Sequence, residues 1–226
     1  MTEGMDWDRD SPEMRARLRT LLNDIELEAV WPLPISAGRI RGYHTTMMTG
    51  FDDPALGRIG RFRGEAGLWY NIEIGDHLGV EPQDVAVEME TYLGRLNAGR
   101  DAVDTALLPP NTVSFEEMMV ADELPEPAHR LPLPDANGLR AVLTLCAFAH
   151  SDFVRIHPLA NGNGRMARLL ANMLAMRYGL PPFVTLRSRP GGRRYAEAAT
   201  ASMNGDWQPT KSLFMDMLDE ALDELS

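Results

Sequence analysis

Residues 157–168 say most about the fold and chemistry of this chain, and they read His157-Pro158-Leu159-Ala160-Asn161-Gly162-Asn163-Gly164-Arg165-Met166-Ala167-Arg168. From Met166 onward, apolar side chains recur at three- and four-residue spacing, which is typical of a helix. Gly179 and the pair Pro181-Pro182 predict the end of that helix. The glycine-rich part of the stretch therefore lies at a helix N-terminus.

This helix N-terminus is suited to bind an anion. The first N–H groups of a helix lack intrahelical partners, and the aligned peptide dipoles leave partial positive charge there. Gly162 and Gly164 let the backbone close around the anion. Arg165 and Arg168 are three residues apart, so their side chains project near one face and can hold neighbouring phosphates. The pattern predicts a site for a di- or triphosphate.

The same stretch resembles the signature of the Fic family, His-Pro-Phe-x-(Asp/Glu)-Gly-Asn-Gly-Arg-x-x-Arg. It departs from the signature at two fixed positions, Leu159 and Asn161. The likeness covers about residues 38–220, so we expect a Fic-like catalytic domain there and a helical extension at residues 1–37. Further matches are Ala147-Phe148-Ala149-His150, Phe153-Val154-Arg155-Ile156, Ile40 and His44, Gly60-Arg61-Phe62-Arg63, Pro82-Gln83-Asp84-Val85, Tyr195 and Gly205-Asp206.

The resemblance implies an all-α, Fic-like helical fold with a small β-hairpin flap at about residues 64–80. In the family such a flap aligns an extended target segment by strand pairing. Other elements are expected from local patterns: a capped helix from Ser11 to before Trp31, a helix at 38–48, a hairpin near 67–75, a helix from about Pro82 to Leu96, a surface connection between Gly99 and Asn137 with a short helix near Glu116, and a central buried helix at 138–154.

The composition is that of one globular domain of 226 residues, 44% hydrophobic and 24% charged. A net charge of −11 argues against general nucleic-acid binding, because phosphate backbones favour basic surfaces. No apolar run approaches the roughly 18–20 residues that span a bilayer, and the first ten residues lack a signal-peptide pattern. The single cysteine, Cys146, excludes an intrachain disulfide. We expect a cytoplasmic protein that binds neither nucleic acid nor membrane.

The resemblance implies that the chain transfers AMP from ATP to a Ser, Thr or Tyr hydroxyl in an extended segment of a target protein. His157 would be the general base, since an imidazole with a reference pKa of about 6.5 accepts protons at neutral pH. The phosphates would be bound by Gly162, Asn163, Gly164, Arg165 and Arg168. Gly164 stands where the phosphotransferase branch of the family has Lys, which favours nucleotidyl transfer.

Two departures from the signature have different consequences. Leu159 replaces one apolar anchor by another, so it changes packing rather than chemistry. Asn161 stands where the family has the carboxylate that helps to hold Mg²⁺, and its amide offers one neutral oxygen instead. Asn161 is therefore the candidate metal ligand. Two other functions stay open: a degenerate Fic fold that binds nucleotide or a partner without turnover, and a relative that transfers UMP or phosphocholine.

The remaining candidates have structural as well as functional interpretations. His150 and His44 are interpreted as packed or hydrogen-bonded structural histidines. Tyr195 either flanks the nucleotide base, as the resemblance implies, or belongs to the core. A loop exposed to solvent is the preferred interpretation of the arginines at 187–194. The family's inhibitory Ser/Thr-x-x-x-Glu motif has no match, only a faint likeness at Glu26, so we expect control by a separate inhibitory protein or an unrecognised segment.

Overall fold

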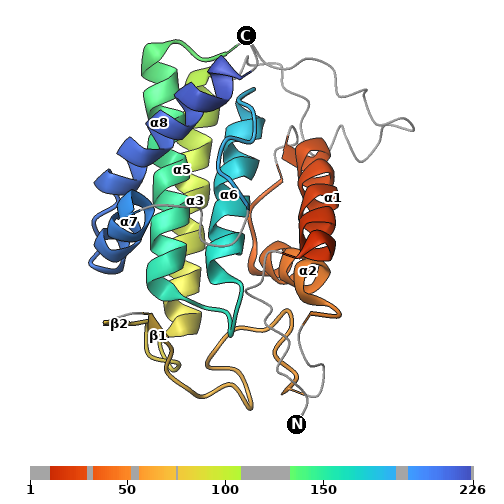
Figure 1. Cartoon of the computed structure of the whole chain (residues 1–226). Coiled ribbons are helices and arrows are strands. Elements are labelled where there is room, and N and C mark those ends of the chain that lie inside the picture. Colours follow the sequence, from red (N-terminus) through yellow and green to blue (C-terminus); the bar gives the residue numbers. More distant parts are fainter. Residues whose placement is uncertain are drawn as a thin grey trace.

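The computed structural model describes residues 11–29, 33–51, 56–74, 76–107, 133–186 and 193–224, which are mostly helical. The helices are α1 (Pro12–Ala29), α2 (Ala37–Met48), α3 (Val85–Leu107), α5 (Ala136–Ile156), α6 (Asn163–Arg177), α7 (Arg193–Met203) and α8 (Gln208–Asp223). Helices α5 and α6 pack against each other at the centre (Figure 1). Helices α1 and α2 contact α6, whereas α3, α7 and α8 contact α5. Within these ranges no helix has the length and apolar character needed to cross a membrane.

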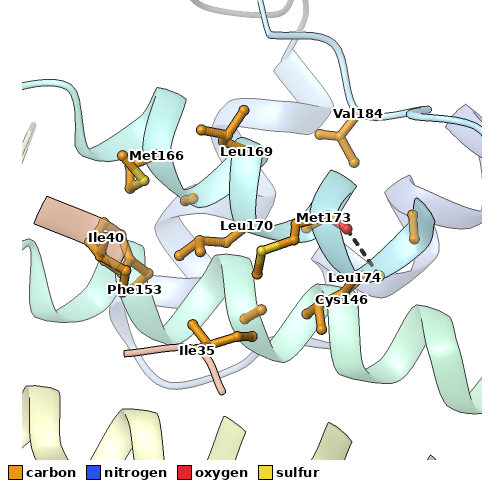
Figure 2. Packing of buried hydrophobic residues seen from close by; sticks show 14 of the residues in the cluster. Ile35, Ile40, Cys146, Phe153, Met166, Leu169, Leu170, Met173, Leu174 and Val184 are labelled. Carbon is orange, nitrogen blue, oxygen red and sulfur yellow. Dashed lines mark hydrogen bonds between the residues drawn. The ribbon is translucent and has the colours of Figure 1, made fainter. Parts of the chain in front are cut away.

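Helix α6 is buried on all sides, and Gly164 is the only one of its 15 residues that is not buried. Its side chains Met166, Leu169 and Leu170 share one core with Ile40 of α2 and Phe153 of α5 (Figure 2). Burying a side chain of this size contributes about 1.5–3 kcal/mol. Both α5 and α6 are therefore central, and their packing fixes the two ends of the loop that joins them.

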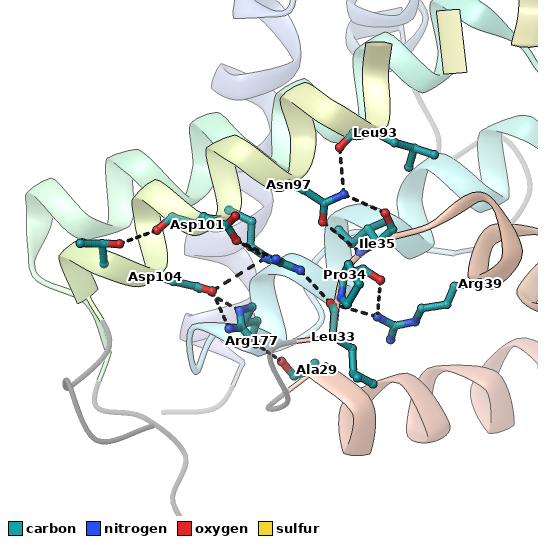
Figure 3. Close-up of polar contacts among 12 residues, drawn as sticks. Ala29, Leu33, Pro34, Ile35, Arg39, Leu93, Asn97, Asp101, Asp104 and Arg177 are labelled. Carbon is teal, nitrogen blue, oxygen red and sulfur yellow. Dashed lines mark hydrogen bonds and ion pairs between the residues drawn. The ribbon is translucent and has the colours of Figure 1, made fainter. Parts of the chain in front are cut away.

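A buried polar cluster ties the connection between α1 and α2 to α3 and α6 (Figure 3). Arg177 of α6 donates two hydrogen bonds to Asp104 of α3, at 2.8 and 2.6 Å. Its NH1 atom also donates to the carbonyl of Ala29, where α1 ends. On α3, Asn97 bonds both backbone groups of Ile35, just before α2. These bonds fix α2, which carries one of the site residues described below.

The expected helices are confirmed, with one error of length. Ser11 caps α1, since its hydroxyl accepts from the Met14 N–H at 3.1 Å. Helix α3 continues to Leu107, so the expected end near Leu96 was wrong. Gly99 is a poor helix former, but a Cβ there would lie 3.0 Å from Leu145 Cδ1, so the glycine serves close packing of α3 on α5. The short helix expected near Glu116 lies outside the described residues.

The hairpin is present but shorter than the expected strand. Strand β1 (Glu73–Ile74) pairs antiparallel with β2 (His77–Leu78). Most of the segment 67–75 is not strand: Leu68, for example, accepts from the Gly64 N–H at 3.0 Å and donates to the carbonyl of Glu65 at 2.8 Å. These local turn bonds use the backbone groups that a strand ladder would need. Gly75 lies outside the described residues, and the role of the hairpin as a flap stays a prediction.

Candidate active site

The loop between α5 and α6 turns at two residues with left-handed backbone conformation. His157 is the C-cap of α5 with φ of 52°, and Gly162 is the N-cap of α6 with φ of 69°. A Cβ at Gly162 would be strained by this positive φ, and it would lie 2.9 Å from Met47 Cε of α2. The loop therefore lies next to the first turn of α6, whose N–H groups have no intrahelical acceptors. This geometry matches the predicted anion cradle.

Asn163 holds the loop through its side chain. Its Oδ1 accepts from the Leu159 N–H at 2.9 Å, and its Nδ2 donates to the Leu159 carbonyl at 2.8 Å. Leu159 itself is fully buried and forms a backbone bridge with Phe62, so it is the apolar anchor that the sequence predicted. The side chain of Asn163 therefore holds the loop together, and its backbone N–H is the group predicted to contact phosphate.

His157 is held in the tautomer that a general base requires. Its Nδ1 lies 3.2 Å from the carbonyl oxygen of Val154, and a carbonyl only accepts, so Nδ1 carries the proton. The lone pair is therefore on Nε2. Burial, together with the charge of Arg63, lowers the pKa of His157 to about 4. The imidazole is neutral at pH 7 and ready to accept a proton.

Arg63 is the residue whose role sequence reasoning missed. Its side chain is 1% exposed. Nε donates to the carbonyl of His157 at 2.8 Å, and NH2 donates to those of Ile156 at 3.0 Å and Val80 at 2.8 Å. NH1 donates to the Tyr70 carbonyl at 3.2 Å. One guanidinium thus joins the loop between α5 and α6 to residues on both sides of the hairpin, and its burial lowers the pKa of Arg63.

Asn161 contacts His44 of α2 rather than standing alone in the loop. The Nδ1 atom of His44 accepts from the Gly60 N–H at 2.9 Å, so the remaining proton of the neutral ring is on Nε2. That Nε2 lies 3.1 Å from Asn161 Oδ1 and donates to it. The expectation of a buried, hydrogen-bonded His44 is confirmed, and the partner is the candidate metal ligand itself.

The residues around Asn161 fit phosphate better than a metal held by protein alone. Magnesium prefers several oxygen ligands, usually including carboxylates, whereas Asn161 offers one neutral oxygen that already accepts from His44. Across the described ranges, no three His, Cys, Asp or Glu side chains are grouped as a metal site. A Mg²⁺ ion here would depend on phosphate oxygens for most of its ligands.

Both motif arginines lie in the first turns of α6, each 4% exposed. The NH1 atom of Arg168 donates to the hydroxyl of Tyr195 at 2.8 Å. That hydroxyl also lies 3.0 Å from His150 Nε2, so Tyr195 links the histidine to Arg168. Burial and the charge of Arg168 lower the pKa of His150 to about 3, so the ring is neutral. His150 is confirmed as a buried, hydrogen-bonded histidine.

These contacts bring the predicted residues together around one loop. The structure places Tyr195 with its hydroxyl against Arg168, while contact of its ring with a nucleotide base stays a prediction. Of the arginines at 187–194, Arg193 and Arg194 are exposed on α7 and pair with Glu197 and Asp216. Arg187 and Arg189 lie outside the described residues. Glu26 is exposed on α1, and nothing places it against Arg168.

The family model described as Fic/DOC family matches residues 34–175, more than half of the chain. This chain belongs to the Fic/DOC family. The protein adenylyltransferase Fic of Drosophila mojavensis is 35% identical over 95 residues, which are 42% of this chain and 18% of the relative. The enzyme of the same name from Aedes aegypti is 36% identical over 77 residues, 34% of this chain and 15% of the relative. The matches therefore span less than a fifth of these relatives.

Solved Fic structures share the fold. A Fic domain containing signaling protein from Bacteroides thetaiotaomicron superposes with a TM-score of 0.60 at 18% identity, over 92% of this chain and 69% of that one. Fic-1 from C. elegans gives 0.59 at 21% identity, over 99% and 52%. The BepC protein of Bartonella tribocorum, solved with bound AMPPNP, gives 0.52 at 15%, over 91% and 86%. The expected Fic-like fold is confirmed.

Proposed function

We propose that this chain is a protein adenylyltransferase that moves AMP from ATP to a hydroxyl of a target protein. One observation carries the proposal. The unprotonated Nε2 of His157 and the first turn of α6, with its two arginines, lie at the two ends of the same loop. The base and the anion cradle lie on one loop whose ends are fixed by α5 and α6. Curated relatives named protein adenylyltransferase Fic support the same reaction.

In this reaction a Ser, Thr or Tyr oxygen attacks the α-phosphorus of ATP. His157 Nε2 takes the proton of that hydroxyl, and the bond to the bridging oxygen breaks so that pyrophosphate leaves. The N–H groups at Gly162, Asn163 and Gly164 would stabilise the phosphate oxygens, and Arg165 and Arg168 would hold the outer phosphates. Magnesium, when bound, would neutralise part of the phosphate charge, with Asn161 as its ligand from the protein.

ATP as co-substrate is supported by the AMPPNP bound to the BepC protein, which shares the fold. The target is proposed to be an extended segment that pairs with the hairpin at residues 73–78. Such strand pairing uses main-chain hydrogen bonds, so it needs little information from the target's side chains. A separate inhibitory protein is the proposed form of control. We place the protein in the cytoplasm as part of the same proposal.

Two alternatives share the same loop. A binding module without turnover is favoured by the contact between Asn161 and His44, since it replaces a carboxylate ligand by an amide whose oxygen is already engaged. A transferase for UMP or phosphocholine would need the same general base and cradle. UMP transfer would differ in the nucleobase that is bound, and phosphocholine transfer in which end of the nucleotide enters.

One experiment separates these functions. The full chain is incubated with Mg²⁺ and a cell lysate, with ATP labelled either in the α- or in the γ-phosphate. AMP transfer gives covalent label from α-labelled ATP only, and excess unlabelled ATP suppresses it more strongly than UTP or CDP-choline. Saturable ATP binding with no covalent label from either form would contradict the proposal and favour the binding module.

A further inference from the structure

A groove far from the loop of the candidate active site lies between α3, α5 and the beginning of α8. Its volume is about 580 Å³, within the range of roughly 300–1,000 Å³ that is usual for small-molecule sites. Along α5 it extends from Asn137 to Phe148. Since each residue of a helix adds about 1.5 Å, its end at Phe148 is more than two turns away from His157. The groove is therefore separate from the nucleotide site.

The floor of the groove is apolar and partly aromatic. Val103 of α3, Leu145 and Phe148 of α5, and Trp207 at the start of α8 contribute to it. Leu145 is buried, whereas Val103, Phe148 and Trp207 are partly exposed. An apolar molecule that filled the groove would gain the free energy of burying this surface.

Three cationic side chains surround this floor, one from each helix: Arg95 from α3, Arg140 from α5 and Lys211 from α8. The guanidinium of Arg95 lies 4.8 Å from the ring centroid of Phe148. None of the three forms an ion pair with a carboxylate of the described residues. The nearby acids cap helix ends instead: Asp135 accepts from the Gly138 N–H at 2.8 Å and Asp206 from the Gln208 N–H at 3.0 Å.

This collection of cations is unusual for a chain with a net charge of −11. Like charges that line one groove repel one another, and a bound anion would offset that repulsion. Lys211 is the only lysine in the sequence. We propose that the groove binds a soluble amphipathic organic anion, an apolar chain or ring system with a carboxylate or a similar headgroup. This inference does not depend on the proposed transferase activity.

The single lysine allows a direct test with decanoate as the probe. Acetylation of Lys211 by acetic anhydride, followed by mass spectrometry, should slow several-fold when decanoate saturates the groove. Calorimetry should show one site per chain, and the tryptophan emission change on binding should disappear in Trp207→Phe. Decyltrimethylammonium and decanol have the same chain without the negative charge, and they should bind at least about tenfold more weakly.

Charge removal at the groove supplies the matched comparison. The variant Arg140→Gln with Lys211→Gln should lose at least tenfold in decanoate affinity, whereas Arg19→Gln, an exposed arginine on α1, should bind like the natural chain. Both variants change side chains on the surface, and circular dichroism checks that they fold. Labelling of target by ATP should be the same in all three proteins, which separates failure here from failure of the transferase assignment.

Three results would overturn the inference. Equal affinity of the double variant and the natural chain would show that the cations do not recognise the anion. Protection of Lys211 by phosphatidylglycerol vesicles but not by decanoate would assign the groove to a membrane surface. Protection that rises with protein concentration, in the absence of any ligand, would assign it to a second copy of this chain.

Discussion

The Nε atom of Arg63 donates a hydrogen bond to the carbonyl oxygen of His157, 2.8 Å away, and the other nitrogens of the same guanidinium bond Val80 and Tyr70 in the hairpin region. The backbone of the proposed base is thus fixed by a side chain that comes 94 positions earlier in the sequence. His157 adopts a left-handed conformation that non-glycine residues rarely adopt, so such support is needed.

Replacing Arg63 tests whether its hydrogen bonds stabilise the backbone of His157. Arg63→Met should lower the free energy of unfolding by about 3 kcal/mol or more, because several buried carbonyls lose their donors at a cost of about 1–3 kcal/mol each. Chemical denaturation measures this, and AMP transfer should fall with it. Arg61→Met is the control, since Arg61 is more exposed and pairs with Glu65 at the surface, where less than about 1 kcal/mol is expected. Similar losses in both variants would argue against a special role for Arg63.

The phosphate clamp predicts a specific effect at Arg168. Arg168→Ala should weaken ATP binding by about 1.5–3 kcal/mol, the usual cost of a lost hydrogen bond to a charged group. Arg168→Lys should not restore it fully, since an ammonium lacks the planar fork. Calorimetry with ATP measures both variants against Arg193→Ala, whose side chain is exposed on α7. Unchanged ATP affinity in both Arg168 variants would rule out the clamp.

Asn161 predicts a dependence on magnesium. A carboxylate at this position would attract Mg²⁺, because unit charges about 4 Å apart interact by roughly 4 kcal/mol at an effective dielectric of 20, doubled for a divalent ion before desolvation is subtracted. Asn161→Asp should therefore lower the Mg²⁺ concentration that gives half-maximal transfer, with little change at saturation.

A titration of transfer against Mg²⁺ measures this, with Asn204→Asp in an exposed turn as the control for added charge. Identical Mg²⁺ curves for Asn161→Asp and the natural chain would show that residue 161 is not at the metal. If only the Asp variant transferred AMP, the natural chain would be the binding module.

The buried cluster in Figure 3 predicts unequal effects for two neighbouring aspartates. Asp104→Asn removes the carboxylate that Arg177 bonds twice, and breaking such a buried pair costs about 3–5 kcal/mol. Asp101→Asn should cost less than about 1 kcal/mol, because its side chain is 64% exposed against 19% for Asp104. Thermal or urea unfolding compares the two, and an equal loss would contradict the assigned role of Asp104.

Much of the fold was predictable because its signals are local. Ser11 caps the first helix, and the apolar residues after Gly164 repeat with the period of a helix. The extent of α3 was not predictable, since Asn97 and Gly99 are poor helix formers whose benefit lies in contacts with Ile35 and Leu145, distant in sequence. Tertiary contacts decided against local propensity there.

The site also contains residues whose proximity follows from local sequence and residues that only tertiary contacts bring together. Residues 157–168 place the base, the glycines and both arginines in one loop, so their proximity followed from sequence alone. Arg63 and Arg61 look equivalent in the sequence, and only the structure shows that one is buried against His157 while the other is at the surface. The contact of His44 with Asn161 was likewise not predictable from the sequence, since 117 positions separate the two residues.

The central claim is that His157 accepts the proton in a transfer of AMP, and the rate of labelling from α-labelled ATP tests it most directly. His157→Ala, compared with the natural chain at equal ATP occupancy and with a matching circular dichroism spectrum, should transfer about 10²–10⁴-fold more slowly. Because the pKa of His157 is lowered to about 4, its ionisation should leave the natural chain's rate unchanged between pH 6 and 8 and reduce it only toward pH 4. A folded His157→Ala variant that labels its target at the natural rate would contradict the account.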